Sequence, residues 1–152
     1  MTRIHADIDA LKRLHQVLAR FRQAGRGVAD RGDDQITMTR ASLETKAIRW
    51  RSRLEQGHAD LGACRRRAAE AAEAGMDPVD CSEYARAVGE AEERLERIRM
   101  WQYRVDAEAS GFLGIASRFR AVLEEDLPRT EEHVLAIIAS LEAARRLQVP
   151  GA

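Results

Sequence analysis

Two pairs of residues in this 152-residue chain have the types and spacing that could support chemistry, and the first is Glu55 with His58. Glu-x-x-His is the spacing with which helical bundles hold carboxylate-bridged di-iron centres. Such a centre needs a second Glu-x-x-His and two more carboxylates, but no other histidine follows a glutamate at this spacing. We therefore expect both side chains on a solvated helix flank, with no catalytic residue, metal or cofactor. A metal-binding helical bundle enzyme is the alternative.

The second pair is Cys64 and Cys81, the two cysteines of the chain. If helices flank a turn near residue 76, the heights of the two cysteines differ by more than about 10 Å, at 1.5 Å per residue. That separation exceeds the reach of a disulfide. We therefore expect free thiols and a cytoplasmic location. The first residues show no apolar signal region, and leaderless secretion is compatible with the same composition.

Opposite charges divide between the two halves of the chain. Residues 1–76 hold 15 Lys plus Arg and 10 Asp plus Glu, whereas residues 77–152 hold 10 and 15, and the total charge is zero. Two oppositely charged halves favour folding onto each other, although exposed ion pairs contribute little individually. Nucleic-acid binding requires a basic surplus that this chain lacks. We expect no nucleic-acid partner, and no uncharged run is long enough to span a membrane.

Apolar residues recur every three or four positions along almost the whole chain, which predicts amphipathic helices. The first series comprises Ile4, Ile8, Leu11, Leu14 with His15, Leu18 and Phe21. A heptad series follows at Ile36, Leu43, Trp50, Gly57, Cys64 and Ala71, with Ala47, Leu54, Leu61 and Ala68 between them. A second heptad series comprises Tyr84, Ala91, Ile98, Val105, Phe112 and Phe119, with Val88, Leu95, Gln102, Ala109 and Ala116 between them. Heptads of this length predict coiled-coil seams.

The midpoint of the chain carries the residues expected at a tight turn between two helices. Gly75 suits the residue that ends a helix, and Pro78 suits the turn. Asp80 with Glu83 three residues later predicts a capping box for the next helix. The expected organisation is a first arm over about 3–74, a tip at 75–79 and a second arm over about 80–147.

Each arm contains one stretch that could interrupt its helix. Three glycines between residues 25 and 34 weaken a helix by about 1 kcal/mol each relative to Ala. Leu18 and Ile36 stay in helical phase across that stretch, which favours one long helix over a loop. Pro128 predicts a kink or a new helix start, after which Val134, Ile137, Ile138, Leu141 and Ala144 continue the pattern. This last series should pair with the first, so that Leu18 meets Val134 and Leu11 meets Leu141.

These patterns predict an all-α fold. The chain should form one domain over residues 1–152, a long antiparallel helical hairpin or coiled coil. It is either continuous or broken near 25–34 and 128 into a four-segment bundle.

The aromatic and apolar residues that such a hairpin leaves uncovered predict an interaction surface. Trp50 and Trp101 are equally distant from the turn, so their indoles should meet, with Tyr103 beside them. Tryptophan and tyrosine dominate interface hot spots. Residues 109–117 are apolar or small on nearly all sides and should be covered by another helix. The predicted interaction residues are Trp50, Trp101, Tyr103, Phe112, Ile115 and Phe119.

Three features resemble the WXG100-type proteins of type VII secretion: Ile4-x-x-Asp7 at the start, the Leu11/Leu18 spacing and a tryptophan in mid-chain. The resemblance covers the N-terminal half. Trp50 is followed by Arg51-Ser52, so Trp-x-Gly is absent, and no Tyr-x-x-x-Asp/Glu signal occurs at Tyr84 or Tyr103. The resemblance implies a small, secretion-associated partner of a larger effector.

The residue patterns favour a non-catalytic protein–protein interaction module over an enzyme. We expect an adaptor or assembly subunit that acts through its helical faces, either as a homo-oligomer or with a protein partner. The secretion-associated partner and the metal-binding bundle are the alternatives.

Overall fold

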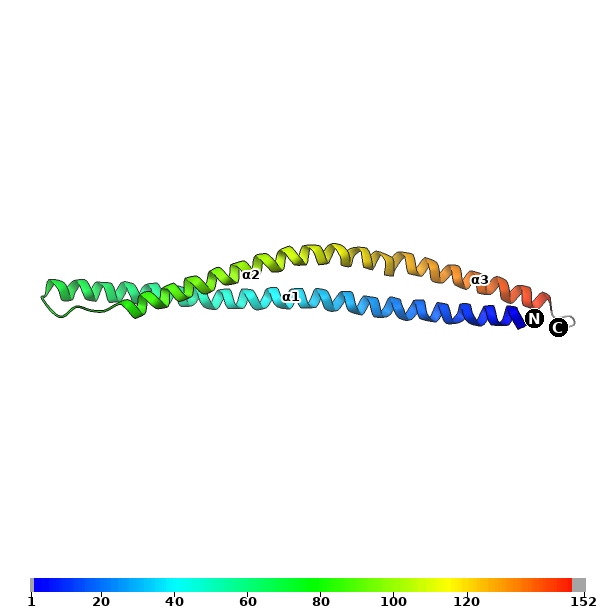
Figure 1. Ribbon diagram of the computed structural model, residues 1–152, viewed down its shortest axis with the longest axis horizontal. Helices are drawn as coiled ribbons and strands as arrows, with labels where there is room; N and C mark the ends of the chain where they lie inside the picture. Colours follow the sequence, from blue (N-terminus) through cyan, green and yellow to red (C-terminus); the bar gives the residue numbers. More distant parts are fainter. Residues whose placement is uncertain (1, 149–152) are drawn as a thin grey trace. The chain divides into compact units, whose positions relative to one another are not determined.

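The computed structural model describes residues 2–148, and it is an all-α helical hairpin, as predicted. Its elements are helix α1 (Thr2–Glu73), helix α2 (Ser82–Ala121), the π-helical turn η1 (Val122–Asp126) and helix α3 (Leu127–Leu147) (Figure 1). None of the described residues forms a strand.

The chain divides into two compact units, and both contain parts of α1 and α2. Unit 1 comprises residues 1–34 and 111–152, and unit 2 comprises residues 35–110. Within each unit, a stretch of α1 packs antiparallel against a later stretch of the chain. This division does not test whether residues 1–152 form one domain, so the single domain stays a prediction.

The tip of unit 2 ends α1 with the hydrogen bonds of a Schellman motif. Gly75 adopts φ +67, a conformation that glycine reaches without the strain imposed by a Cβ. The amide of Met76 donates to the carbonyl of Ala71 at 2.9 Å, and the amide of Gly75 donates to the carbonyl of Ala72 at 3.3 Å. The predicted role of Gly75 as the residue that ends the helix is confirmed.

The second arm begins two residues later than predicted, at Ser82. The backbone amide of Ser82 donates to Oδ1 of Asp80 at 2.9 Å. This bond, together with a weaker one from the Ser82 side chain, holds the pKa of the Asp80 carboxyl below its ordinary value. Asp80 therefore accepts a hydrogen bond at the start of α2, but the donor is Ser82, two residues later, rather than Glu83 as the predicted capping box required.

Cys64 and Cys81 form a disulfide, so the prediction of two free thiols is wrong. Their Cα atoms lie 5.8 Å apart. The error came from treating every residue past the tip as helical, whereas residues 76–81 have no helical structure. Six extended residues span about 20 Å, which offsets the roughly 16 Å that eleven helical residues rise from Cys64 to Gly75. The extended segment thus returns Cys81 to the level of Cys64.

The same segment sets the register of unit 2 and separates the tryptophans. Val88 packs against Gly57, and Nε2 of Gln102 donates to Glu44 at 3.4 Å. These pairs place Trp50 level with a residue about six positions before Trp101, which is about 9 Å along a helix. The predicted meeting of the two indoles is therefore wrong.

The seam of unit 2 is built mainly from small and aliphatic residues. A β-carbon added at Gly57 would lie 3.1 Å from Cγ2 of Val88 and 3.8 Å from its Cα, so the two backbones approach closely here. Every predicted seam position in this unit is buried or half-buried except Tyr84. The buried members are Ala47, Gly57, Leu61, Cys64, Ala71, Val88, Ala91, Leu95, Ile98 and Ala109.

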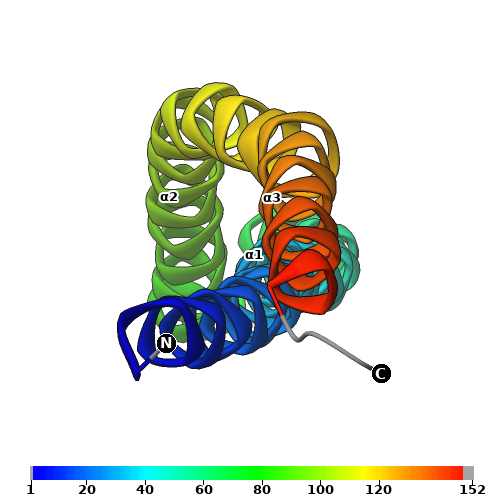
Figure 2. The ribbon, with the colours of Figure 1, turned by 90° about the vertical axis from the view of Figure 1, so that its right-hand side faces the viewer.

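Unit 1 closes around larger side chains. Ile8, Val134 and Ile138 form a buried cluster, and Ile4, Leu11, Leu18 and Leu141 pack against it. The predicted pairing of the first series with the last is thereby confirmed. Figure 2 shows the end of this unit, where the start of α1 (blue) lies beside the end of α3 (red).

The glycine-rich stretch of unit 1 is helical, so α1 is not broken between residues 25 and 34. Its glycines accept large side chains from the facing helix. A β-carbon at Gly25 would lie 2.8 Å from Leu123, which is fully buried, and 3.0 Å from Phe119. A β-carbon at Gly32 would overlap with the ring of Phe112. The helical propensity lost at these positions is thus exchanged for close packing.

The predicted interruption at Pro128 takes the form of a π-helical turn just before it. The amide of Leu127 donates to the carbonyl of Val122, five residues earlier. Pro128 has no amide to donate, so the regular helical pattern cannot continue through it. The π turn inserts one extra residue and lets α3 start with Pro128 in its first turn.

Candidate interaction surfaces

The Glu55 and His58 side chains are exposed on α1 of unit 2, on the flank where the sequence analysis placed them. Within residues 2–148, no group of three or more His, Cys, Asp or Glu side chains lies close enough to hold a metal ion. The fold therefore adds no further ligand to these two residues.

Trp50 is half-buried against its own unit. The Arg53 guanidinium lies 4.5 Å and the Arg94 guanidinium 5.4 Å from the centre of the Trp50 ring. Such cation–π contacts are worth about 0.5–1 kcal/mol at exposed sites. Trp50 therefore fixes Arg94 of α2 against α1.

Trp101 and Tyr103 remain exposed on α2, at 55% and 77% of their surfaces. The Arg104 guanidinium lies 5.0 Å from the Trp101 ring, within the same helix. Residues two apart on a helix do not share a face, so these two aromatics point in different directions. They are available to a partner, but they do not form one patch.

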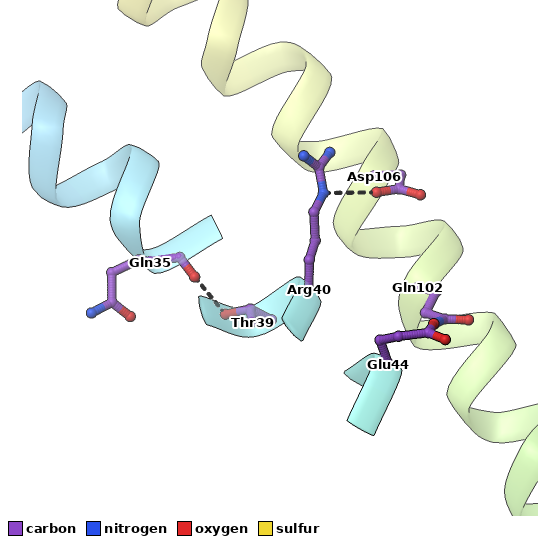
Figure 3. Close-up of polar contacts among 6 residues, drawn as sticks. All are labelled: Gln35, Thr39, Arg40, Glu44, Gln102 and Asp106. Carbon is purple, nitrogen blue, oxygen red and sulfur yellow. Dashed lines mark hydrogen bonds and ion pairs between the residues drawn. The ribbon is translucent and has the colours of Figure 1, made fainter. Parts of the chain in front are cut away.

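Polar contacts hold unit 2 together beside Trp101. Nε of Arg40 donates to Oδ1 of Asp106 at 3.0 Å, and Gln102 lies next to Glu44 (Figure 3). Both Arg40 and Asp106 are exposed, and exposed pairs contribute at most about 1 kcal/mol. These contacts therefore favour one alignment of the two helices but add little to the stability of unit 2.

Unit 1 brings Ile115 and Phe119 together. The two residues are four apart and therefore share a face of α2. Ile115 is 68% exposed, whereas Phe112 and Phe119 are half-buried over Gly32 and Gly25. Residues 109–117 are covered within the chain on one side, because Ala109 and Ala116 are buried while Leu113 and Ile115 are exposed. Their coverage by a partner helix or a second copy stays a prediction.

The sequence analysis missed a second apolar stripe on α1 of unit 1. It had assigned Leu14 and Phe21 to the core series, but both are exposed. They belong instead to a parallel series with heptad spacing whose members are all exposed. This α1 stripe consists of Ala10, Leu14, Val17, Phe21, Ala24 and Val28. The alternating spacing of four and three residues was visible in the sequence and could have identified it.

The α1 stripe continues onto α2 through one aromatic contact. The Phe21 and Phe119 rings meet edge to face with centroids 6.5 Å apart. Ile115 and Val122 flank Phe119 at the positions that share its face, and both are exposed. We call the α1 stripe together with Ile115, Phe119 and Val122 the apolar surface of unit 1.

The α1 side of this surface is basic. Residues 10–29 hold five Lys plus Arg and no acidic residue. Lys12 pairs with Glu142 at 3.1 Å and Arg22 with Glu131 at 3.3 Å, on the side that faces α3. Within residues 2–148, neither Arg13 nor Arg20 has an acidic partner. Within that part of the chain, their guanidinium groups therefore form no ion pair of 4.0 Å or less.

A further ion-pair group closes unit 1 at the other end of the α1 stripe. Arg120 of α2 contacts Asp33 and, at 3.4 Å, Asp30. The hydrogen bond that Arg120 donates to the Asp33 carboxylate raises the pKa of Arg120 above its ordinary value. Two of the acidic residues that follow the stripe, Asp30 and Asp33, are thus engaged within the chain.

No described helix combines the length and apolar character needed to cross a membrane. No protein-family model matches the chain, and no curated protein or solved structure matches it either.

Proposed function

We propose that the protein is a non-catalytic helical interaction module, an adaptor or assembly subunit that acts through its exposed helical faces. The observation that supports this function best is the apolar surface of unit 1. Val17, Phe21 and Val28 expose more than half of their surfaces in one continuous series on α1. Contiguous apolar patches of this kind mark interaction sites in proteins.

The surface has the form by which helices recognise helices. Anchors at i, i+3 (or i+4) and i+7 are the contacts of an amphipathic helix in a groove. The α1 stripe offers six positions with the spacing of a coiled-coil seam. Trp101 and Tyr103 of unit 2 offer a separate aromatic contact on the same protein.

One observation favours the alternative, a secretion-associated partner of a larger effector. Disulfides persist in oxidising compartments and are rare in the cytosol, and Cys64 is bonded to Cys81. The disulfide thus favours export over the cytoplasmic location expected from the sequence. Alkylation of the protein in intact cells, without added reductant, tests this: blocked thiols support export, and fully reactive thiols contradict it.

Photo-cross-linking tests the proposed function itself. A photoreactive phenylalanine analogue placed at Val17 or Ile115 should give a discrete protein adduct in the source cells. The same analogue at Arg66, an exposed residue on the polar face of unit 2, provides the matched control. Equal adducts at all three positions, or none at any, would contradict an interaction role for this surface.

A further inference from the structure

The chemistry of the apolar surface of unit 1 also specifies the kind of partner, provided that the proposed interaction function holds. We propose that this surface binds an amphipathic helix of a partner protein whose apolar stripe is flanked by acidic residues. Three features carry the proposal: the heptad period of the α1 stripe, the charge of its free edge, and the hollow at its end.

The heptad period of the α1 stripe indicates that the molecule bound there is a helix. The spacing of four and three residues repeats from Ala10 to Val28, which matches the 3.5-residue repeat of a coiled-coil seam. Lipid offers no periodic partner for such a seam. The stripe and the Ile115–Val122 face adjoin at the Phe21–Phe119 contact, so a third helix could touch both.

The residues that flank the exposed side of the α1 stripe indicate which charge the partner helix carries. In the heptad of Leu14 and Phe21, the preceding residues Arg13 and Arg20 occupy positions at which coiled coils form interhelical ion pairs. The opposite edge carries Leu11 and Leu18, which already pack against the core of unit 1. A partner helix therefore meets arginine on its accessible side. Glutamate or aspartate at its flanking positions would complement these charges.

The far end of the stripe is hollowed where small residues replace large ones. Ala24, Gly27 and Val28 line a shallow depression together with Arg20, Gln23 and Arg31. The Arg31 guanidinium lies over Gly27, so an acidic side chain of the partner can reach Arg20 and Arg31 here. Across the surface the rim is mixed, since Arg118 shares the face of Ile115 while Glu125 follows Val122. The charge preference therefore comes from α1.

A second copy of the chain fits this edge less well. In a two-fold symmetric dimer the same patch faces itself. An antiparallel pairing of the α1 stripe with its own copy would place Arg13 and Arg20 beside their equivalents, and such like-charge contacts are unfavourable. In a parallel pairing Arg13 would face Leu18, which offers it no acidic partner. The charge pattern therefore favours a different chain as the partner.

The test uses two synthetic 21-residue helical peptides with leucine at the six seam positions. One has glutamate at the flanking positions, and its matched control has lysine there. Fluorescence anisotropy with the full-length protein should show the glutamate peptide binding at least tenfold more tightly, with a preference that falls as salt rises. Equal affinity for the two peptides, or no binding of either, would overturn the proposal.

Variants locate the binding. Val17→Ser with Val28→Ser should abolish binding, whereas Met38→Ser with Ile48→Ser, an exposed apolar pair of unit 2, should leave it unchanged. Arg13→Glu with Arg20→Glu should reverse the preference in favour of the lysine peptide. Circular dichroism confirms that each variant is folded. Binding that survives the Val17/Val28 change would place the site elsewhere and overturn the proposal.

Two further measurements distinguish a partner helix from a lipid surface and from a second copy of the chain. Binding to vesicles of phosphatidylserine and phosphatidylcholine, abolished by Val17→Ser with Val28→Ser in the absence of peptide binding, would identify a lipid surface. A concentration-dependent doubling of mass in light scattering, abolished by the same change, would identify a second copy. Either result overturns the acidic-helix partner. The second leaves the proposed interaction function intact, whereas a failed cross-linking experiment contradicts that function itself.

Discussion

The two units share the same heptad pattern, but the side chains that fill their seams differ in size. In unit 2 the seam is narrow, because residues such as Ala47, Gly57 and Ala91 let the two backbones approach closely. In unit 1 the seam holds Phe112, Phe119 and other large side chains above glycines. Unit 2 is fixed covalently at its tip by the disulfide, whereas unit 1 contains neither cysteine and is held by noncovalent contacts.

The difference extends to the outer surfaces. Unit 1 buries one charged side chain, Glu131, beside Arg22 and leaves a second apolar stripe exposed on α1. In unit 2 the exposed aromatics Trp101 and Tyr103 point in different directions and form no stripe. A heptad seam thus predicts where two helices meet, but the residues beside the seam decide whether a third helix can bind.

Removal of the disulfide should have the largest effect and should act on unit 2 alone. Cys64 and Cys81 are 17 residues apart, and closing a loop of this size stabilises a protein by about 3 kcal/mol. Cys64→Ser with Cys81→Ser should lower the free energy of unfolding in urea by about that amount. Hydrogen exchange should accelerate near the tip.

The reduced wild-type protein serves as the control for this pair and should behave like the double variant. Exchange in residues 4–28 should stay unchanged. An equal acceleration in both units would show that they are not independently stabilised, and the comparison would fail.

A pair of glycine variants tests the packing of unit 1. Gly25→Ala introduces a methyl group against buried Leu123, and overpacking of this kind costs about 1–3 kcal/mol. The gain in helix propensity, about 1 kcal/mol, offsets part of that cost. We expect Gly25→Ala to lower the free energy of unfolding by about 1 kcal/mol overall.

Gly114→Ala is the matched change, because no atom outside the local helix lies within 4 Å of a β-carbon there. It should raise the free energy of unfolding by up to about 1 kcal/mol. Thermal unfolding of both variants measures the difference. Two changes of the same sign would show that Gly25 has no packing role.

The smallest predicted effect is on the pH dependence of stability, and it is tested at one carboxylate from each unit. The Ser82 amide lowers the pKa of Asp80 in unit 2, and Lys12 lowers the pKa of Glu142 in unit 1. A lowered pKa in the folded state stabilises the protein above the unfolded-state pKa, and this contribution disappears as pH falls through the folded-state pKa.

The free energy of unfolding decreases as the pH falls, and Asp80→Asn and Glu142→Gln should each make this decrease slightly smaller. Salt should weaken the effect at Glu142, whose partner is an exposed lysine, more than at Asp80, whose partner is a backbone amide. Unfolding curves between pH 3 and pH 7 with and without added salt measure this. Equal salt dependence at the two positions would contradict the assigned causes.

Periodicity identified the seam residues because the pattern of burial along a helix depends only on which faces are apolar. Val88, Leu95 and Ile98 are buried as predicted, and α1 remains helical through the glycine-rich stretch. Leu14 and Phe21 were assigned wrongly because two apolar stripes lie side by side on one helix. Periodicity alone could not tell which of the two faced the other arm.

The sequence by itself determined the helices, the turn at Gly75 and the seam, because these depend on local propensity and on the 3.5-residue repeat. Only the tertiary structure decided the register, since the extended path of residues 76–81 sets how far α2 is displaced along α1. That displacement bonds Cys64 to Cys81 and separates Trp50 from Trp101. Likewise, only packing in three dimensions decided which apolar stripe of α1 is covered and which is left for a partner.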